Sequence, residues 1–167
     1  LHGKAMIVLS TRKSVFKLYN FMIEQKPEYK DILIAVVTET NKDTVEMREL
    51  FGNSDYRKDL AEEFKKEDSK YKIAIVVDMW LTGFDVPDLD VMYFFKRLKS
   101  HALMQAIARV NRVYPGKEHG LIVDYIGLNK LLSSALEEYT ARDQDFNIQD
   151  IQKESYNILK ENLSILN

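Results

Sequence analysis

The sequence predicts an α/β fold, a three-layer sandwich in which helices cover both faces of a mainly parallel β-sheet. Five short apolar runs alternate with amphipathic segments along the 167 residues. The runs are apolar at nearly every position, as expected for strands buried on both faces of a parallel sheet. The length of 167 residues is enough for one domain with its own core, or for one domain plus an appendage. The hydrophobic fraction of 46% is ordinary for a soluble globular protein.

The first half of the chain begins with a predicted strand at 4–10, a short run of apolar residues. A helix is predicted over 11–25, because apolar residues recur there at helical spacing and a proline follows. The run 32–37 predicts a second buried strand. The polar stretch 39–55 is interpreted as a charged, mobile loop that holds a helical turn at about 45–51.

The second half continues with an amphipathic helix over 56–68, followed by predicted strands at 73–77 and 91–95. A helix is predicted over 100–113, and its first residue, a serine, is a suitable N-cap. The run 120–125 predicts the fifth strand. The order of these elements is that of a parallel sheet built from strand–helix–strand units.

The predicted α/β domain occupies residues 1–143, and 144–167 is interpreted as the start of a C-terminal helical extension. Helices are predicted at 129–142 and 148–166. The chain has no cysteine, so disulfides, thiolate metal sites and a cysteine nucleophile are excluded. No apolar run approaches the roughly 20 residues needed to span a bilayer. We therefore expect a cytoplasmic protein without a membrane partner.

Ligands of such folds bind at the carboxyl ends of the strands. The loops after Ser10, Asp78 and Phe95 are therefore the predicted functional edge. The net charge of the chain is −2, so any contact with a polyanion must come from a local patch or from other parts of a larger protein.

The predicted helix over 100–113 carries three polar side chains on one face. At about 100° per residue, Gln105, Arg109 and Arg112 fall within roughly a 60° arc. The opposite side of the helix is apolar and carries Leu103, Ile107 and Val110. Two neighbouring guanidinium groups suit a phosphate, because each can donate two parallel hydrogen bonds. Spacing alone leaves open a solvated face, or arginines paired to acidic residues of the same domain.

Two loops of the predicted edge carry further candidates. In the loop after Asp78, Gly83 allows either a close approach of the backbone or a positive φ, and Thr82 and Asp85 offer a hydroxyl and a carboxylate. Asp85 could accept a hydrogen bond from a ribose or hold an arginine, and a simple turn that it caps is the alternative. The segment Ser10-Thr11-Arg12 could contact a backbone phosphate, or it could serve only to cap the following helix.

Two aromatic features have simpler interpretations. Trp80 could stack on a base or adenine, or it could pack between elements of the lobe. The nine tyrosines are scattered, and no aromatic platform for a single strand is apparent.

The segment from Thr82 to Pro87, followed by Gln105 to Arg112, resembles motifs V and VI of superfamily 2 helicases and translocases. The wider pattern, which continues to Gly127, is similar to the restriction (R, motor) subunit of type I restriction-modification enzymes. The first strand and its Ser10-Thr11-Arg12 end resemble motif IV. One departure from the family is Lys96-Arg97, where the family often has a different stretch, and no role is assigned to these two residues.

The resemblance implies the second RecA-like lobe of a motor, with ATP bound in the cleft between two lobes. It implies that Arg109 and Arg112 are arginine fingers that reach the triphosphate. Gln105 would lie near the same site, and Gly83 and Asp85 would link nucleotide binding to DNA binding. No metal site is expected within this chain. ATP and Mg would be bound mainly by the first lobe, because no Gly-x-x-x-x-Gly-Lys loop occurs here.

The resemblance also implies DNA-backbone contacts from Ser10, Thr11, Arg12 and Thr82. The implied partners are double-stranded DNA, the first lobe and nuclease domain of the same subunit, and separate methyltransferase and specificity subunits. The isolated chain is predicted to be inactive, since it lacks the phosphate-binding loop. Two alternatives remain open, which are another superfamily 2 DNA or RNA helicase lobe and a non-catalytic α/β docking module.

Overall fold

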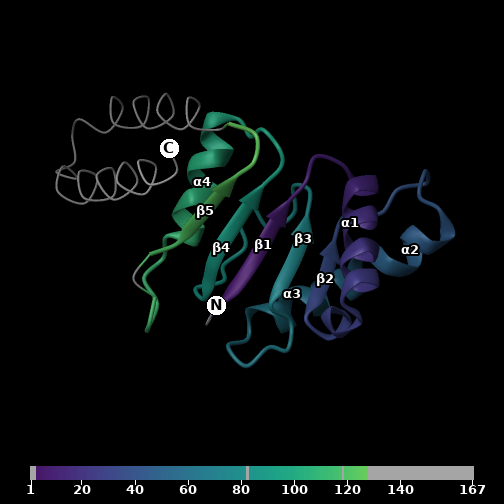
Figure 1. Ribbon diagram of the computed structural model, residues 1–167, viewed down its shortest axis with the longest axis horizontal. Coiled ribbons are helices and arrows are strands. Elements are labelled where there is room, and N and C mark those ends of the chain that lie inside the picture. The colour runs from purple at the N-terminus through teal and green to yellow at the C-terminus, as the bar shows by residue number, and fades with distance from the viewer. Residues whose placement is uncertain (1–2, 82, 118, 128–167) are drawn as a thin grey trace.

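The computed structural model describes residues 3–81, 83–117 and 119–127 (Figure 1). The predicted boundary between residues 143 and 144, and the predicted helices at 129–142 and 148–166, lie outside the described residues. Thr82 lies outside them as well.

The described chain forms one five-stranded parallel sheet. Its strands are β1 (Lys4–Val8), β2 (Leu33–Val36), β3 (Ile73–Val76), β4 (Leu89–Phe94) and β5 (Leu121–Asp124). Their order across the sheet is β2-β3-β1-β4-β5, and every neighbouring pair is parallel. The predicted α/β sandwich is confirmed, and each predicted strand is present within a few residues of its expected ends.

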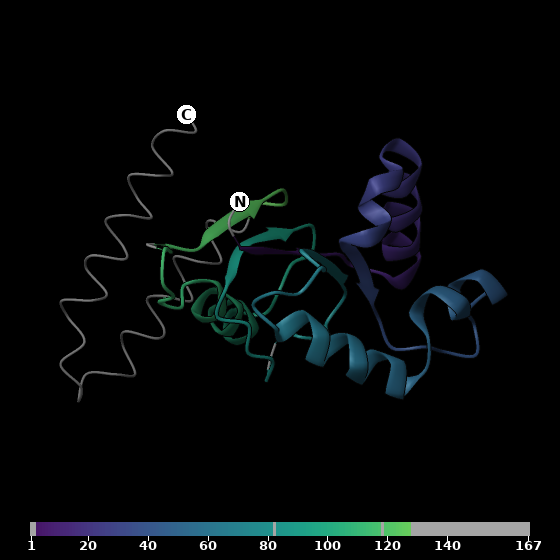
Figure 2. The same ribbon diagram turned by 90° about the horizontal axis from the view of Figure 1, so that it is seen from below.

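The helices cover the sheet from both sides. They are α1 (Arg12–Gln25), the short 3-10 helix η1 (Pro27–Asp31), α2 (Val45–Phe51), α3 (Ser54–Lys65) and α4 (Ser100–Val110). Figure 2 shows α1 on one face and α3 and α4 on the other. The predicted helical turn at 45–51 is confirmed as α2, where Thr44 caps the first turn and Phe51 is buried at the last residue.

Two apolar clusters hold the layers together, one on each face of the sheet. Met6, Val8 and Val76 pack with Phe64 of α3 and Leu103 of α4. On the other face, a second cluster joins the sheet to α1 and α2 and includes Val15, Leu33, Phe51 and Ile75. Successive residues of a strand point to opposite faces, so β1 and β3 contribute to both clusters.

A buried ion pair fixes the start of the central strand, and it was not predicted. Lys4, with 0% of its surface exposed, places its Nζ 2.6 Å from Oδ2 of Asp88. The same Nζ donates to the carbonyl of Lys66 at 2.7 Å. Removing one partner of a buried pair typically costs about 3–5 kcal/mol. The pair thus joins β1 to the segment before β4 and to the end of α3.

Candidate functional site

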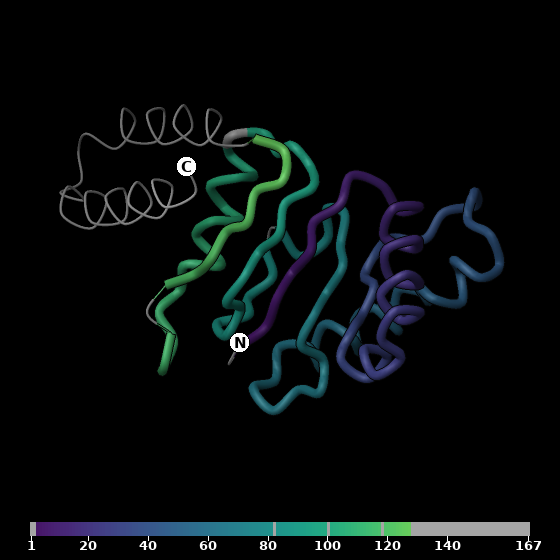
Figure 3. The backbone as a smooth tube through the Cα atoms, viewed as in Figure 1, coloured from purple at the N-terminus to yellow at the C-terminus, as the bar shows by residue number. Residues whose placement is uncertain are grey.

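Three loops meet at the carboxyl edge of the sheet, where the sequence places the site. Figure 3 shows the chain leaving β1, β3 and β4, which are neighbours in the sheet, at the same edge. Oγ of Ser10 donates to the carbonyl of Phe95 at 3.1 Å, which links the loop after β1 to the loop after β4. Lys96 forms an ion pair with Asp78, which links the loop after β4 to the loop after β3.

The loop after β3 is fixed by an aromatic stack. Trp80 is buried, and its ring centroid lies 4.1 Å from that of Phe84 and 5.3 Å from that of Phe64 on α3. Its φ of 69° is the one positive value among the described residues other than glycine. A bulky residue holds this conformation only where its surroundings compensate for the strain. The interpretation of Trp80 as a packing residue is confirmed.

Arg109 holds the same loop from the other side. Its Nε donates to the carbonyl of Leu81 at 3.1 Å, and its Nη1 donates to the carbonyl of Phe84. The two acceptors flank Gly83, whose φ is 69°, which is one of the two possibilities that the sequence left open. Apart from Gly83 itself and its two chain neighbours, no atom of the described residues lies within 4 Å of the place where a Cβ would stand on Gly83. One guanidinium group therefore bridges the turn, and the glycine leaves open space beside it.

Arg112 lies beyond the helix, and the prediction that the helix runs to 113 is wrong. Helix α4 ends at Val110, and the cap residue Asn111 has left helical geometry, with φ −93° and ψ 20°. The backbone of Gly120 packs against this end so closely that a Cβ there would lie 2.0 Å from the carbonyl oxygen of Val110. Arg112 consequently does not share a helical face with Gln105 and instead forms an ion pair with Asp85.

The other polar residues of α4 have local partners. Nε2 of Gln105 lies 2.8 Å from Nε2 of His101, one turn earlier, so Gln105 is engaged within its own helix. The predicted N-cap at residue 100 is wrong, because Lys99 occupies the cap position and makes no side-chain cap hydrogen bond. The predicted apolar side of the helix is confirmed by Leu103 and Val110, which are both buried.

The segment after β1 shows the capping arrangement that the sequence left open. Oγ1 of Thr11 accepts a hydrogen bond from the backbone N–H of Ser14 at 3.1 Å, so Thr11 caps α1. Arg12 forms an ion pair with Asp43, a carboxylate with only 2% of its side chain exposed. Ser10, Thr11 and Arg12 therefore all have partners within the described part of the lobe.

Comparison with known proteins supports the family suggested by the motifs. Residues 23–127 match the family model described as type I restriction enzyme subunit R domain 3. The chain belongs to this family. Its fold is that of the second RecA-like helicase lobe.

Two curated relatives of this R-subunit domain come from different microbes. It is 44% identical over 150 residues to a Methanocaldococcus jannaschii protein named among type I restriction endonuclease subunits (MjaIXP), covering 90% of this chain. It is 43% identical over 147 residues to the Haemophilus influenzae type I restriction enzyme HindI endonuclease subunit, covering 83% of this chain. In both cases the chain spans about 14% of the length of the relative.

A solved structure with the same fold is Saccharomyces cerevisiae Dbp5 bound to RNA and ADP BeF3. The TM-score is 0.59 at 15% identity, and the match covers 94% of this chain and 38% of that one. At this identity the likeness concerns the fold alone. None of the described helices of the R-subunit domain is long and apolar enough to cross a membrane.

Sequence reasoning missed Lys117 in the R-subunit domain. Its Nζ donates to the carbonyls of Leu89 at 2.7 Å and Pro87 at 3.3 Å, where the loop after β3 leads into β4. Burial lowers the pKa of Lys117, since it disfavours the charged ammonium. No local pattern marks such a lysine, because its acceptors lie 28 and 30 residues earlier in the chain.

Proposed function

We propose that this chain is the second motor lobe of an ATP-dependent DNA translocase, the endonuclease subunit of a type I restriction enzyme. In this proposal Arg112 is the arginine finger that reaches the ATP triphosphate across the cleft to the first lobe. The observation that carries the proposal is the ion pair of Arg112 with Asp85, whose side chains are 51% and 55% exposed. Exposed pairs contribute about 0–1 kcal/mol, so a triphosphate can replace Asp85 at small cost.

The neighbouring residues receive supporting roles. Arg109 keeps the loop after β3 in place through Nε and Nη1, and it also binds the triphosphate through Nη2, which donates in neither of those bonds. Asp85, once released from Arg112, accepts a hydrogen bond from a ribose hydroxyl. Gly83 permits close approach of the nucleotide, and Gln105 contributes a polar group nearby. Two contacts support these roles. Arg112 pairs with Asp85, and the two carbonyls that accept hydrogen bonds from Arg109 flank Gly83.

DNA binding is assigned to the carboxyl ends of β1 and β3. Ser10, Thr11 and Arg12 at the start of α1, together with Thr82, are the proposed contacts to the DNA backbone. Backbone N–H groups at the start of a helix are suited to phosphate oxygens. The hydrogen bond between Ser10 and Phe95 supports this assignment, since it fixes the loop at the edge where the nucleotide loop also lies.

The remaining components are assigned to other parts of the enzyme. ATP would be held mainly by the first lobe, with Mg, and this lobe would stabilise the charge that develops on the transferred phosphoryl group. The proposed partners are double-stranded DNA, the first lobe and nuclease domain of the same subunit, and the methyltransferase and specificity subunits. The names of the relatives support this assembly, since they are restriction endonuclease subunits.

The test is DNA-stimulated ATP hydrolysis by the full-length subunit. Arg112→Ala should lower kcat by on the order of 10³-fold, the usual contribution of an arginine finger. Arg48→Ala on α2 is the matched control and should leave kcat unchanged. Undiminished hydrolysis in both Arg109→Ala and Arg112→Ala would refute the assignment. The isolated 167-residue chain should hydrolyse no ATP, and robust turnover by it would show that the first lobe is not needed.

A further inference from the structure

Basic residues are concentrated in two segments of the chain. Segments 3–23 and 91–117 together carry ten of the 24 lysines and arginines and none of the 26 acidic residues, although the whole chain has a net charge of −2. The first segment covers β1 and most of α1, and the second covers most of β4 and all of α4. Because β1 and β4 are neighbours in the sheet, the two segments without acidic residues lie side by side.

Four of these ten cations lack a partner in the described part of the chain. Ion pairs or hydrogen bonds to backbone carbonyls engage the other six, which are Lys4, Arg12, Lys96, Arg109, Arg112 and Lys117. The four remaining side chains are all exposed, and they are those of Lys13, Lys17, Arg97 and Lys99. Their positive charges are therefore not compensated by any described residue.

Three of the four lie where the chain passes from a strand into a helix at the carboxyl edge of the sheet. Lys13 is in the first turn of α1, Arg97 is in the loop after β4, and Lys99 is the residue before α4 (Figure 1). A hydrogen bond of 3.1 Å joins the loops after β1 and β4 at this edge. Lys17 lies one turn further along α1, about 6 Å from Lys13 along the helix axis. The three charges thus gather where the two loops meet.

Helix α3 shows how a solvated charged face is built in the same chain. Three lysines at α3 each pair with an acidic residue three positions earlier, in the pairs Lys58–Asp55, Lys65–Glu62 and Lys66–Glu63. Helices α2 and α3 also carry an acidic residue in the first turn, whereas α1 and α4 carry none. The start of a helix is positively polarised, so unpaired cations there do not stabilise the fold. Such cations are suited to an external anion instead.

We propose that Lys13, Arg97 and Lys99 bind the phosphate backbone of duplex DNA, an inference that rests on the proposed function of the lobe in a DNA translocase. Duplex DNA carries one negative charge for about every 1.7 Å of its axis, so a single duplex can face several cations of one edge. Contacts to phosphate carry no sequence information, which suits a motor that moves along any sequence. The surface extends the DNA contacts proposed for segment 10–12 onto the loop after β4.

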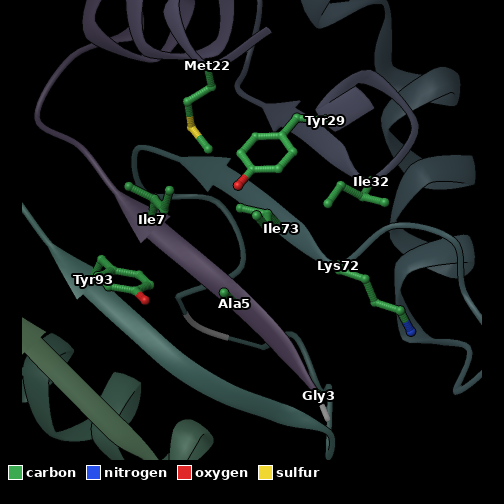
Figure 4. Close-up of a pocket in the computed structure, with 9 residues that line it drawn as sticks. All are labelled: Gly3, Ala5, Ile7, Met22, Tyr29, Ile32, Lys72, Ile73 and Tyr93. Carbon is green, nitrogen blue, oxygen red and sulfur yellow. The ribbon is translucent and has the colours of Figure 1, made fainter. Parts of the chain in front are cut away.

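This surface is separate from the other candidate ligand sites of the lobe. Arg109 comes ten residues after Lys99, about 15 Å further along the axis of α4, so the cations proposed to bind ATP belong to the other end of this helix. The cavity between α1 and the sheet has a volume of about 390 Å³, and Lys72 is the one charged residue among the described residues that line it (Figure 4). Arg97 also belongs to the stretch in which this chain departs from the family pattern, so the motifs assign it no role.

Salt-dependent DNA binding by the full-length subunit tests the proposal. The probe is a fluorescent duplex oligonucleotide of arbitrary sequence, titrated without ATP over a range of NaCl concentrations. In Arg97→Ala/Lys99→Ala, the slope of log K against log salt concentration should decrease in magnitude by about 2, because each phosphate contact releases about one counterion. Lys13→Ala should decrease it by about 1. The loss of affinity should be about equal for duplexes of different sequence.

The matched control removes two exposed lysines at the opposite edge of the sheet. Lys30 precedes β2 and Lys70 precedes β3, so Lys30→Ala/Lys70→Ala changes the net charge by the same amount and should keep the parental slope. Arg97→Lys keeps the positive charge and should also keep the slope. In the DNA-stimulated ATPase assay, Arg97→Ala/Lys99→Ala should raise the DNA concentration needed for half-maximal stimulation and leave the KM for ATP unchanged.

Four results would overturn the proposal. An unchanged slope in Arg97→Ala/Lys99→Ala would mean that the surface does not contact DNA, and an equal decrease in the control would assign the effect to net charge alone. A loss in Arg97→Lys as large as that in the alanine variant would make Arg97 a support of the fold. A raised KM for ATP with unchanged DNA binding would assign the surface to the nucleotide. The role of Arg112 is tested separately through kcat, so either proposal can fail while the other stands.

Discussion

Arg112 forms an ion pair with Asp85 that joins the residues after α4 to the loop after β3. Both side chains are about half exposed, whereas Arg109, three residues earlier, bonds to two backbone carbonyls of the same loop. The two arginines of the motif therefore differ in how firmly they are held. Arg112 is paired at the surface, and Arg109 supports the loop through its backbone.

The Arg112–Asp85 pair should contribute little to stability. We predict that a double-mutant cycle with Arg112→Ala and Asp85→Ala gives a coupling free energy below about 1 kcal/mol, because water screens exposed charges. The coupling should decrease further at high salt. Urea denaturation of the 167-residue chain measures it. A coupling above about 2 kcal/mol would contradict easy replacement of Asp85 by a triphosphate.

Arg109→Ala should destabilise the lobe by about 2–3 kcal/mol, since hydrogen bonds from a charged donor contribute more than neutral ones. Arg109→Lys keeps the charge but cannot reproduce the two-donor geometry, so it should recover only part of the loss. The measurement is again the free energy of unfolding in urea, with Arg48→Ala as the control. If Arg109→Ala proves as stable as the parent, the bonds to Leu81 and Phe84 do not hold the loop.

Trp80→Ala should cost about 3–5 kcal/mol, as expected when a large aromatic side chain is removed from a core. Trp80→Phe should cost less, because a ring remains between Phe64 and Phe84. Trp80 is the only tryptophan, so its fluorescence reports on the loop directly. We expect short-wavelength emission from the folded chain, with an unfolding midpoint that coincides with loss of circular dichroism. Emission typical of exposed indole in the folded chain would argue against the stack.

Two glycines near the site should respond differently to alanine. Gly120→Ala places a Cβ against the backbone of Val110 and should cost on the order of 3 kcal/mol, since backbone must move. Gly83→Ala meets open space and should cost only about 1–2 kcal/mol, from the left-handed conformation. Thermal unfolding of the two variants compares them. A larger loss for Gly83→Ala would mean that the loop packs more tightly there than the structure shows.

The order of the elements and the edge at which three loops gather were predictable from local patterns. Apolar runs such as 73–77 and helical spacing over 11–25 depend on residues close together in the chain. The carboxyl ends of parallel strands must lie at one edge, so the loops after β1, β3 and β4 could be placed together in advance. A positive φ at Gly83 was one of two possibilities that the sequence offered, because glycine is the residue that adopts a positive φ most readily.

The arrangement within the site was not predictable to the same degree. A continuous helix to residue 113 would have put Gln105 and Arg112 on one face, but α4 ends at Val110. The helix ends where Gly120, ten residues later, packs against it. Gln105 then pairs with His101, which any helix of this sequence would allow at a spacing of four residues. The spacing of residues along a helix could not decide whether Gln105 lies beside Arg112 or pairs with His101.

By itself the sequence determined the class of fold, the order of its strands and helices, and the edge at which the loops gather, because these follow from local periodicity. Only the tertiary structure decided which partners the charged residues find. Arg109 bonds to a carbonyl 25 residues away, and Lys4 bonds to a carboxylate 84 residues away. Such partners are set by how the sheet brings distant segments together, and for that reason no local pattern distinguishes the loosely held Arg112 from the firmly held Arg109.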